Sequence, residues 1–172
     1  MSEIPERLRN KVTNVLSLLD YMYPTEDKCY LNHSNAYELL IATMLSAQCT
    51  DDRVNMVTEK LFKKYTSLEA FAQADIKELE QDIRSTGFYH NKAKNIITAA
   101  NQLLTDYNGE MPSDIDSLTG LAGVGRKTAN LVRTHIFHIA SIVVDTHVKR
   151  ISNKLGLTES DDPVKIEFEL MD

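Results

Sequence analysis

Apolar residues recur at helical spacing along almost the whole chain, and few turn-forming residues interrupt them. Spacings of three and four residues place apolar side chains on one face of a helix. The clearest examples are Leu8, Val12, Val15, Leu16 and Leu19, followed by Ala93, Ile96, Ile97, Ala100, Leu103, Leu104 and Tyr107. Only 6 Gly and 4 Pro occur in 172 residues, which argues against a sandwich or barrel of many short strands. The sequence therefore predicts an all-α fold of about nine or ten helices.

Residues that cap helices indicate where these helices begin and end. Asn, Ser and Asp accept hydrogen bonds from the free amides of a first turn, and Gly adopts the left-handed conformation that follows a last turn. The expected starts are Ser34 or Asn35, Asp51, Asp75 and Asp145, and the expected ends are Gly87, Gly109, Gly120 and Gly156. The run Ile-Val-Val at 142–144 is interpreted as a buried connector into the helix that Asp145 begins.

The formal charge of −6 argues against a nucleic-acid partner, but its distribution argues for one. Residues 84–150 carry 8 basic and 5 acidic groups, whereas the segments on either side are acidic. Between Ser117 and Arg150 a single acidic residue, Asp145, stands among five cations. The middle of the chain is thus a basic segment in which a lone carboxylate suggests a special role.

The sequence contains no feature of a membrane or secreted protein. No window approaches the roughly 18 apolar residues of a spanning helix, and the first ten residues are charged where a signal peptide is apolar. We therefore expect a cytoplasmic or nucleoid protein with no membrane partner. Cys29 and Cys49 lie 20 residues apart without a second pair, which predicts reduced thiols and neither a disulfide framework nor a metal site.

A glycine-rich hairpin, Leu-Thr-Gly-Leu-Ala-Gly-Val-Gly-Arg-Lys-Thr at 118–128, joins two expected helices. The amides of Val124, Gly125 and Arg126 open the second helix and can face a phosphate. The spacing differs from that of a Walker loop, and a simple tight helix turn remains an alternative. Lys127 lies in the first turn, where the helix dipole disfavours an ammonium and favours a nucleophilic amine; the alternative is a phosphate clamp.

Four ordered blocks resemble the endonuclease III family of DNA base-excision glycosylases. They are LLIATMLSAQCTDDRVN, GFYHNKAKNI, LAGVGRKTANLV and VVDTHVKRISNKLGL, and the similarity covers Ala36 to Leu157. The resemblance implies that Lys127 attacks the deoxyribose C1′ and that Asp145 is the catalytic aspartate. By position alone Asp145 is also a helix cap, and the two roles are compatible.

The resemblance also implies a set of DNA-binding residues. Gln48 would fill the gap left by an extruded nucleotide, and Phe88 would be an apolar wedge in the base stack. The remaining candidates are phosphate contacts and residues of the hairpin: Lys92, Gly123, Val124, Gly125, Arg126, Thr128 and Arg150. The alternatives are a polar helix end for Gln48, a core aromatic for Phe88 and a solvated helix face for the cations.

Two departures from the family pattern matter. The hairpin reads Leu-Ala-Gly where the family has Leu-Pro-Gly, a mild change. Family members also continue into four cysteines that bind an iron–sulfur cluster, and this chain has no such spacing. We therefore expect no cofactor in this chain; a [4Fe-4S] cluster is expected only if a further segment with four cysteines exists.

The resemblance implies a helix-hairpin-helix DNA glycosylase fold with two subdomains. The first is a six-helix, barrel-like subdomain at 35–134 that ends in the hairpin motif at about 113–134. The second combines 1–34 with 135–172, and the pattern at its end suggests that it is cut short.

The function implied is a monomeric DNA glycosylase and β-elimination lyase that acts on oxidised or damaged pyrimidines and abasic sites in double-stranded DNA. One alternative is a non-catalytic hairpin module or inactive fragment. Another is a mismatch adenine glycosylase, which Lys127 disfavours.

Overall fold

The computed structural model describes residues 6–23 and 29–171, and every regular element in these ranges is helical. The elements, in order, are α1 Glu6–Met22, α2 Ala36–Ser46, α3 Asp51–Lys64, α4 Leu68–Ala72, α5 Ile76–Asp82, the 3-10 helix η1 Arg84–Thr86, α6 Tyr89–Asp106, α7 Ile115–Gly120, α8 Arg126–Phe137, α9 Thr146–Leu155 and α10 Pro163–Met171. The all-α prediction is confirmed. Parts of the predicted second subdomain, at 1–5, 24–28 and 172, lie outside the described residues.

Three of the predicted helix starts are confirmed by their caps. The side chains of Asn35, Asp75 and Asp145 each accept a hydrogen bond from an amide in the first turn of the helix that follows. The prediction of Asp51 as a cap was wrong. Thr50 has the extended backbone of a cap and accepts from the amide of Arg53, so Asp51 is already the first helical residue.

Three of the four predicted glycine stops have a positive φ: Gly87, Gly109 and Gly156. Gly156 has the left-handed conformation expected after a last turn, whereas Gly87 combines φ 71° with an extended ψ of 159°. The fourth was wrong, because Gly120 is the last residue of α7 and the chain leaves the helix at Leu121 in an extended conformation. The connector at 142–144 is confirmed as irregular chain that leads into α9, although it is half-buried rather than fully buried.

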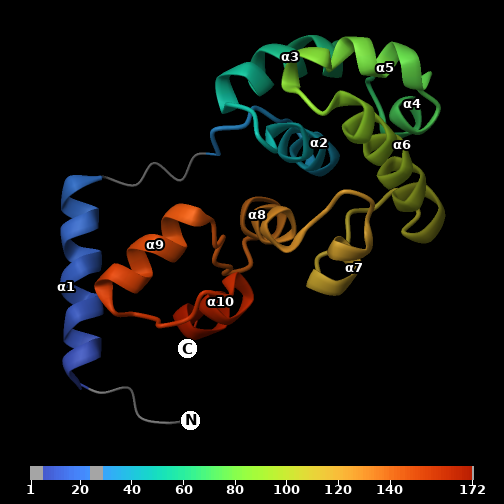
Figure 1. Ribbon diagram of the computed structural model, residues 1–172. Helices are drawn as coiled ribbons and strands as arrows, with labels where there is room; N and C mark the ends of the chain where they lie inside the picture. Colours follow the sequence, from blue (N-terminus) through green and yellow to red (C-terminus); the bar gives the residue numbers. More distant parts are fainter. Residues whose placement is uncertain (1–5, 24–28, 172) are drawn as a thin grey trace.

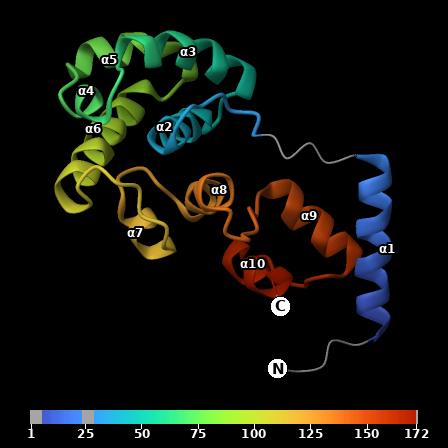
Figure 2. The same ribbon diagram turned by 180° about the vertical axis from the view of Figure 1, so that it is seen from behind.

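One apolar core is shared by α2 to α8. Helix α2 is almost entirely enclosed, since Leu39 to Leu45 are all buried; α3, α6 and α8 pack against it, and α4 and α5 pack on α6 (Figure 1). Helix α8 adds Ala129 and Val132 to the same core, and α7 packs beside α8. The view from behind shows α9 and α10 on the far side of α8 from α2, with α1 next to α9 (Figure 2).

Helix α1 has no buried residue. Its apolar side chains at Leu16, Leu18 and Leu19 are exposed, and Lys11 Nζ donates to the carbonyl of Leu155 at the end of α9. Within the described residues no helix is long and apolar enough to span a membrane.

Candidate active site and nucleic-acid interface

The hairpin between α7 and α8 is built around one close backbone approach. Gly123 has φ +76°, and a Cβ there would lie 2.7 Å from Asn95 Nδ2 on α6. Both facts require glycine. Gly125 then caps α8 without any side-chain bond, unlike α2, α3, α5 and α9, whose caps are side-chain oxygens. The first turn of α8 is therefore available to an external anion.

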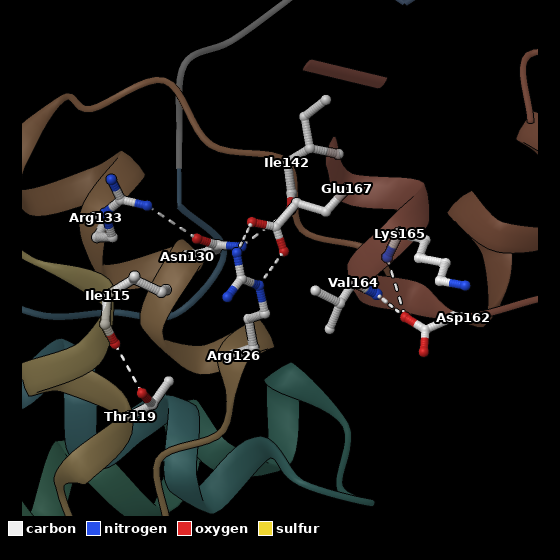
Figure 3. A network of polar contacts seen from close by, with 10 residues as sticks. All are labelled: Ile115, Thr119, Arg126, Asn130, Arg133, Ile142, Asp162, Val164, Lys165 and Glu167. Atoms are coloured by element: carbon white, nitrogen blue, oxygen red, sulfur yellow. Dashed lines mark hydrogen bonds and ion pairs between the residues drawn. The ribbon is translucent and has the colours of Figure 1, made fainter. Parts of the chain in front are cut away.

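Two predicted hairpin contacts need correction. The Val124 amide donates to the carbonyl of Leu121 at 3.1 Å, and its side chain is buried in the core, so it presents no free donor. Arg126 forms two bonds with Glu167 of α10, with Nε to Oε2 at 2.7 Å and a terminal nitrogen to Oε1 at 2.9 Å (Figure 3). Two of the guanidinium nitrogens of Arg126 are thus engaged within the protein, and the side chain is 31% exposed.

Lys127 lies in the first turn of α8, as predicted, and its side chain is exposed. It lines a cavity of about 480 Å³ together with Gln48 and the half-buried Thr128. The cavity runs between α8, the C-terminal end of α2 and the segment at 29–31. The structure therefore brings the predicted nucleophile next to the residue predicted to fill the gap in the DNA.

Asp145 caps α9 and also faces the charge of Lys127. Its Oδ1 accepts from the amides of His147 at 2.9 Å and Val148 at 2.8 Å. Burial by itself raises the pKa of Asp145, but these two amides and the Lys127 charge outweigh it and hold the pKa below its ordinary value. The carboxylate is therefore ionised at neutral pH, and no described residue donates a hydrogen bond to Oδ2.

Asn130 connects the helix of Lys127 to the chain that carries Asp145. It is buried in α8, and its Nδ2 donates to the carbonyl of Ile142 at 3.3 Å, in the connector before Asp145 (Figure 3). Its Oδ1 accepts from Arg133 at 3.3 Å. The sequence analysis missed this residue, since an Asn inside a helix gives no signal of a partner 12 residues away.

Gln48 and Phe88 both line a second, smaller cavity. Both side chains are exposed, and both backbones are left-handed, with φ +55° and +49°. Such a backbone is uncommon outside glycine and marks positions that their surroundings fix. The cavity, of about 220 Å³, is also lined by Asn95 and Gly123, so it extends to the hairpin. At 64% exposure Phe88 is not the core aromatic of the alternative interpretation.

The prediction of Lys92 as a phosphate contact was wrong. Its residue surface is 6% exposed, and its Nζ donates to three main-chain carbonyls. Burial lowers the pKa of Lys92. Arg150, in contrast, is exposed on α9 and forms no ion pair with any described residue, so it stays a candidate phosphate contact.

Asp51 and His135, neither of which the sequence pattern identified as a site residue, also line the cavity of Lys127. They lie 84 residues apart in a chain without repeats, so only the fold brings them together. A larger groove of about 660 Å³ lies between the segment at 29–34 and α3, and it contains none of the predicted site residues.

The residues present do not fit an iron–sulfur cluster. A four-cysteine cluster needs four thiolates, and the sequence has two cysteines, both free in the structure. Among residues 6–23 and 29–171 no group of three or more His, Cys, Asp or Glu side chains is placed to hold a metal ion. The expectation that such a cluster needs a further four-cysteine segment stays a prediction.

Comparisons with known proteins identify relatives of this chain. Residues 41–172 match the family model described as HhH-GPD superfamily base excision DNA repair protein. The Endonuclease III of Synechocystis sp. is 48% identical over 164 residues, which cover 95% of this chain and 74% of that protein. The Endonuclease III of Bacillus subtilis is 49% identical over 151 residues, covering 87% of this chain and 68% of that protein.

Solved structures of DNA glycosylases also resemble this chain. A non-covalent Endonuclease III–DNA complex matches with a TM-score of 0.88 and 47% identity, covering 94% of this chain and 76% of that chain. A thermostable thymine-DNA glycosylase matches with a TM-score of 0.84 at 21% identity, covering 96% of this chain and 80% of that chain, which shows a shared fold.

Proposed function

The chain belongs to the HhH-GPD superfamily of base excision DNA repair proteins, and within it to the endonuclease III family. On this basis we propose how its residues excise a base and cleave the abasic site. The observation that carries the proposal is the position of Lys127. Its exposed amine lies in the uncapped first turn of α8, lines a cavity with Gln48, and lowers the pKa of Asp145 by its charge.

Lys127 is proposed as the nucleophile. The unprotonated amine attacks C1′ of the deoxyribose while the bond to the damaged base breaks, and the base leaves with the bonding electrons and takes up a proton. Loss of a proton from the nitrogen and opening of the sugar ring give a Schiff base. Removal of a C2′ proton then expels the 3′ phosphate by β-elimination, which cleaves the strand.

Asp145 is proposed to assist these proton transfers and to stabilise the cationic character of the sugar. Because its pKa lies below the ordinary value, it is a carboxylate when the sugar becomes cationic. Its Oδ1 is held by two amides of α9, so the group cannot rotate freely. The Asn130 bond to Ile142 keeps the connector before Asp145 at a fixed place along α8.

The DNA interface is proposed to have two parts. The free amides at the start of α8, with Gly123 forming the turn, and the exposed Arg150 contact phosphates. Gln48 and Phe88 enter the base stack at the extruded nucleotide. Lys92 is not proposed as a phosphate contact, because all three of its donors bind carbonyls within the protein, and two nitrogens of Arg126 are likewise engaged by Glu167.

We further propose that the substrates are oxidised or otherwise damaged pyrimidines and abasic sites in duplex DNA, and that the protein acts on cellular DNA as a monomer. The family resemblance, together with the cavity at Lys127, supports this substrate class. A mismatch adenine glycosylase is disfavoured, because that activity needs no lysine at position 127. A non-catalytic hairpin module is disfavoured because it needs neither Lys127 nor the carboxylate that caps α9.

Borohydride trapping on a duplex with one abasic site tests the proposal. Reduction converts the Schiff base into a stable cross-link, so the protein and DNA should migrate together on a denaturing gel. Without borohydride, the same mixture should show a nicked strand. Binding without either product would favour the non-catalytic module.

A further inference from the structure

The ammonium group of Lys92 binds both of the chain segments that lead to Gln48 and Phe88, the two residues proposed to enter the base stack. Its Nζ donates to the carbonyls of Leu45 at 2.8 Å, Ala47 at 2.9 Å and Thr86 at 2.8 Å. An ammonium has three donors, so all three are used. The residue is 6% exposed, and no described carboxylate pairs with it.

The three carbonyls belong to the ends of two helices. Leu45 lies in the last turn of α2 and Ala47 is its C-cap. Main-chain carbonyls at this end of a helix lack partners within the helix, and the helix dipole gives this end a partial negative charge. Thr86 ends the 3-10 helix η1. The buried cation therefore satisfies carbonyls that would otherwise be unpaired, and it does so on two segments that are separate in the sequence.

One residue with a left-handed backbone follows closely after each of these carbonyls. Gln48 follows Ala47 directly with φ +55°, and Phe88 follows Thr86 by two residues with φ +49°. A non-glycine residue keeps such a backbone only where the surrounding structure fixes it. The bonds from Lys92 provide that restraint on the chain immediately before both residues. Lys92 also lines the small cavity between Gln48 and Phe88.

We propose that Lys92 is a positioning residue that holds Gln48 and Phe88 at a set separation, so that both side chains enter the duplex together at the damaged nucleotide. The inference rests on the proposed DNA roles of these two residues. Lys92 acts through them and touches no phosphate. Its contribution is therefore to the recognition of a flipped or missing base and is absent from binding to intact duplex.

The test compares affinity for two duplexes of one sequence, with and without a tetrahydrofuran abasic-site analogue, by fluorescence anisotropy. Lys92→Met keeps the buried stem but removes all three donors. We expect it to weaken binding to the abasic-site duplex by roughly 10²-fold, because inserted side chains offset an unstacking cost of that order, with intact-duplex affinity unchanged. The matched control is Lys94→Met, an exposed lysine on the same helix, which should leave the ratio of the two affinities unchanged.

Lys92→Arg separates positioning from charge. The planar guanidinium keeps the positive charge but cannot direct three donors at carbonyls that converge on one point. Lys92→Arg should therefore lose most of the preference for the abasic-site duplex. If Lys92→Met does not fold, the ratio of the two affinities is measured on Lys92→Arg instead. A variant with full preference, or an equal loss on both duplexes, would overturn the proposal.

A final comparison places Lys92→Met in a Gln48→Ala, Phe88→Ala background. If Lys92 acts through those residues, the background should have lost the preference already and Lys92→Met should add nothing. A further loss of similar size would show that Lys92 acts elsewhere. If the wild type does not prefer the abasic-site duplex, the proposed function fails; if it does and Lys92→Met keeps that preference, only this inference fails.

Discussion

Arg126 and Glu167, 41 residues apart in the sequence, form a two-bond ion pair that fastens α10 to the first turn of α8. The Glu167 side chain is 5% exposed and that of Arg126 is 31% exposed. The guanidinium also lies over the ring of Phe168, 5.1 Å from its centroid. The contact therefore joins the C-terminal helix to the helix that carries Lys127.

Arg126→Ala should destabilise the fold rather than weaken DNA contacts. It leaves the buried Glu167 carboxylate without its partner, and we expect a loss of about 3 kcal/mol, the lower end for buried pairs because Arg126 is partly exposed. Urea unfolding measures this loss. Lys149→Ala, which breaks the exposed pair with Asp161, is the control and should cost less than about 1 kcal/mol. An unchanged unfolding midpoint for Arg126→Ala would contradict the structural role.

The same pair should make stability depend on pH in the acid range. Burial raises the pKa of Glu167, but the bonds from Arg126 and Asn130 outweigh it and hold the pKa below its ordinary value. A lowered folded-state pKa stabilises the protein above the unfolded value of about 4.3, and this stability is lost as pH falls through the lower folded value. The stability difference between wild type and Glu167→Gln should therefore be full at pH 7 and shrink below about pH 4. A stability difference that does not change with pH would exclude an ionised Glu167 paired with Arg126.

Lys127→Gln should abolish the covalent intermediate and leave the fold intact. The amine is exposed and takes part in no ion pair with a described residue, so its loss removes no internal contact. No Schiff base can form, and borohydride should yield no cross-link. Duplex affinity should stay within a few-fold of wild type, because the amides at the start of α8 remain. Lys154→Gln, in the last turn of α9, is the control and should cross-link as wild type does.

Asp145→Asn should separate catalysis from capping. The amide oxygen of Asn can still accept from His147 and Val148, so stability should change little. The carboxylate charge is lost, and turnover should fall by roughly 10²- to 10⁴-fold. Asp145→Ala should lose the cap as well, at about 1 kcal/mol in thermal or urea unfolding. Equal stability of these two variants would argue against the capping role, and full activity of Asp145→Asn against the catalytic one.

Gly123→Ala should distort the hairpin. The new Cβ would meet Asn95 and would sit on a backbone with φ +76°, so we expect a loss of about 2 kcal/mol or more. Gly120→Ala is the matched control, because no atom lies within 4 Å of its Cβ position and its φ is not positive. It should be neutral or slightly stabilising in the same unfolding experiment. Similar losses for the two variants would mean that the close approach to α6 is not rigid.

Local signals in the sequence were enough to predict the helices and most of their ends. A cap depends on residues two or three positions apart, as at Asn35 and Asp75, so its pattern can be seen directly. Asp51 was misassigned because Thr50 offers the same chemistry one residue earlier. The placement of Lys127 in the first turn of α8 follows from the glycines before it.

At the candidate site, the two mispredicted cations have partners that lie far along the chain. Lys92 and Arg126 have the pattern of exposed phosphate contacts, but their partners are Leu45, 47 residues away, and Glu167, 41 residues away. The same holds for the bond from Asn130 to Ile142. A charge pattern gives the number of cations in a segment, whereas only the packed structure shows which of them face outward.

Helix α8 carries an exposed Lys127 on the same three turns as Ala129 and Val132, both of which are 0% exposed. Amides next to fully buried residues exchange their hydrogen only when the surrounding core opens. The amides of the first turn are free, but the turns that follow are fixed in the core at Ala129 and Val132, so the reactive amine is carried by an anchored helix and not by a surface loop. In the proposed reaction the amine therefore starts from a position set by the core, and the sugar of the damaged nucleotide has to be brought to it.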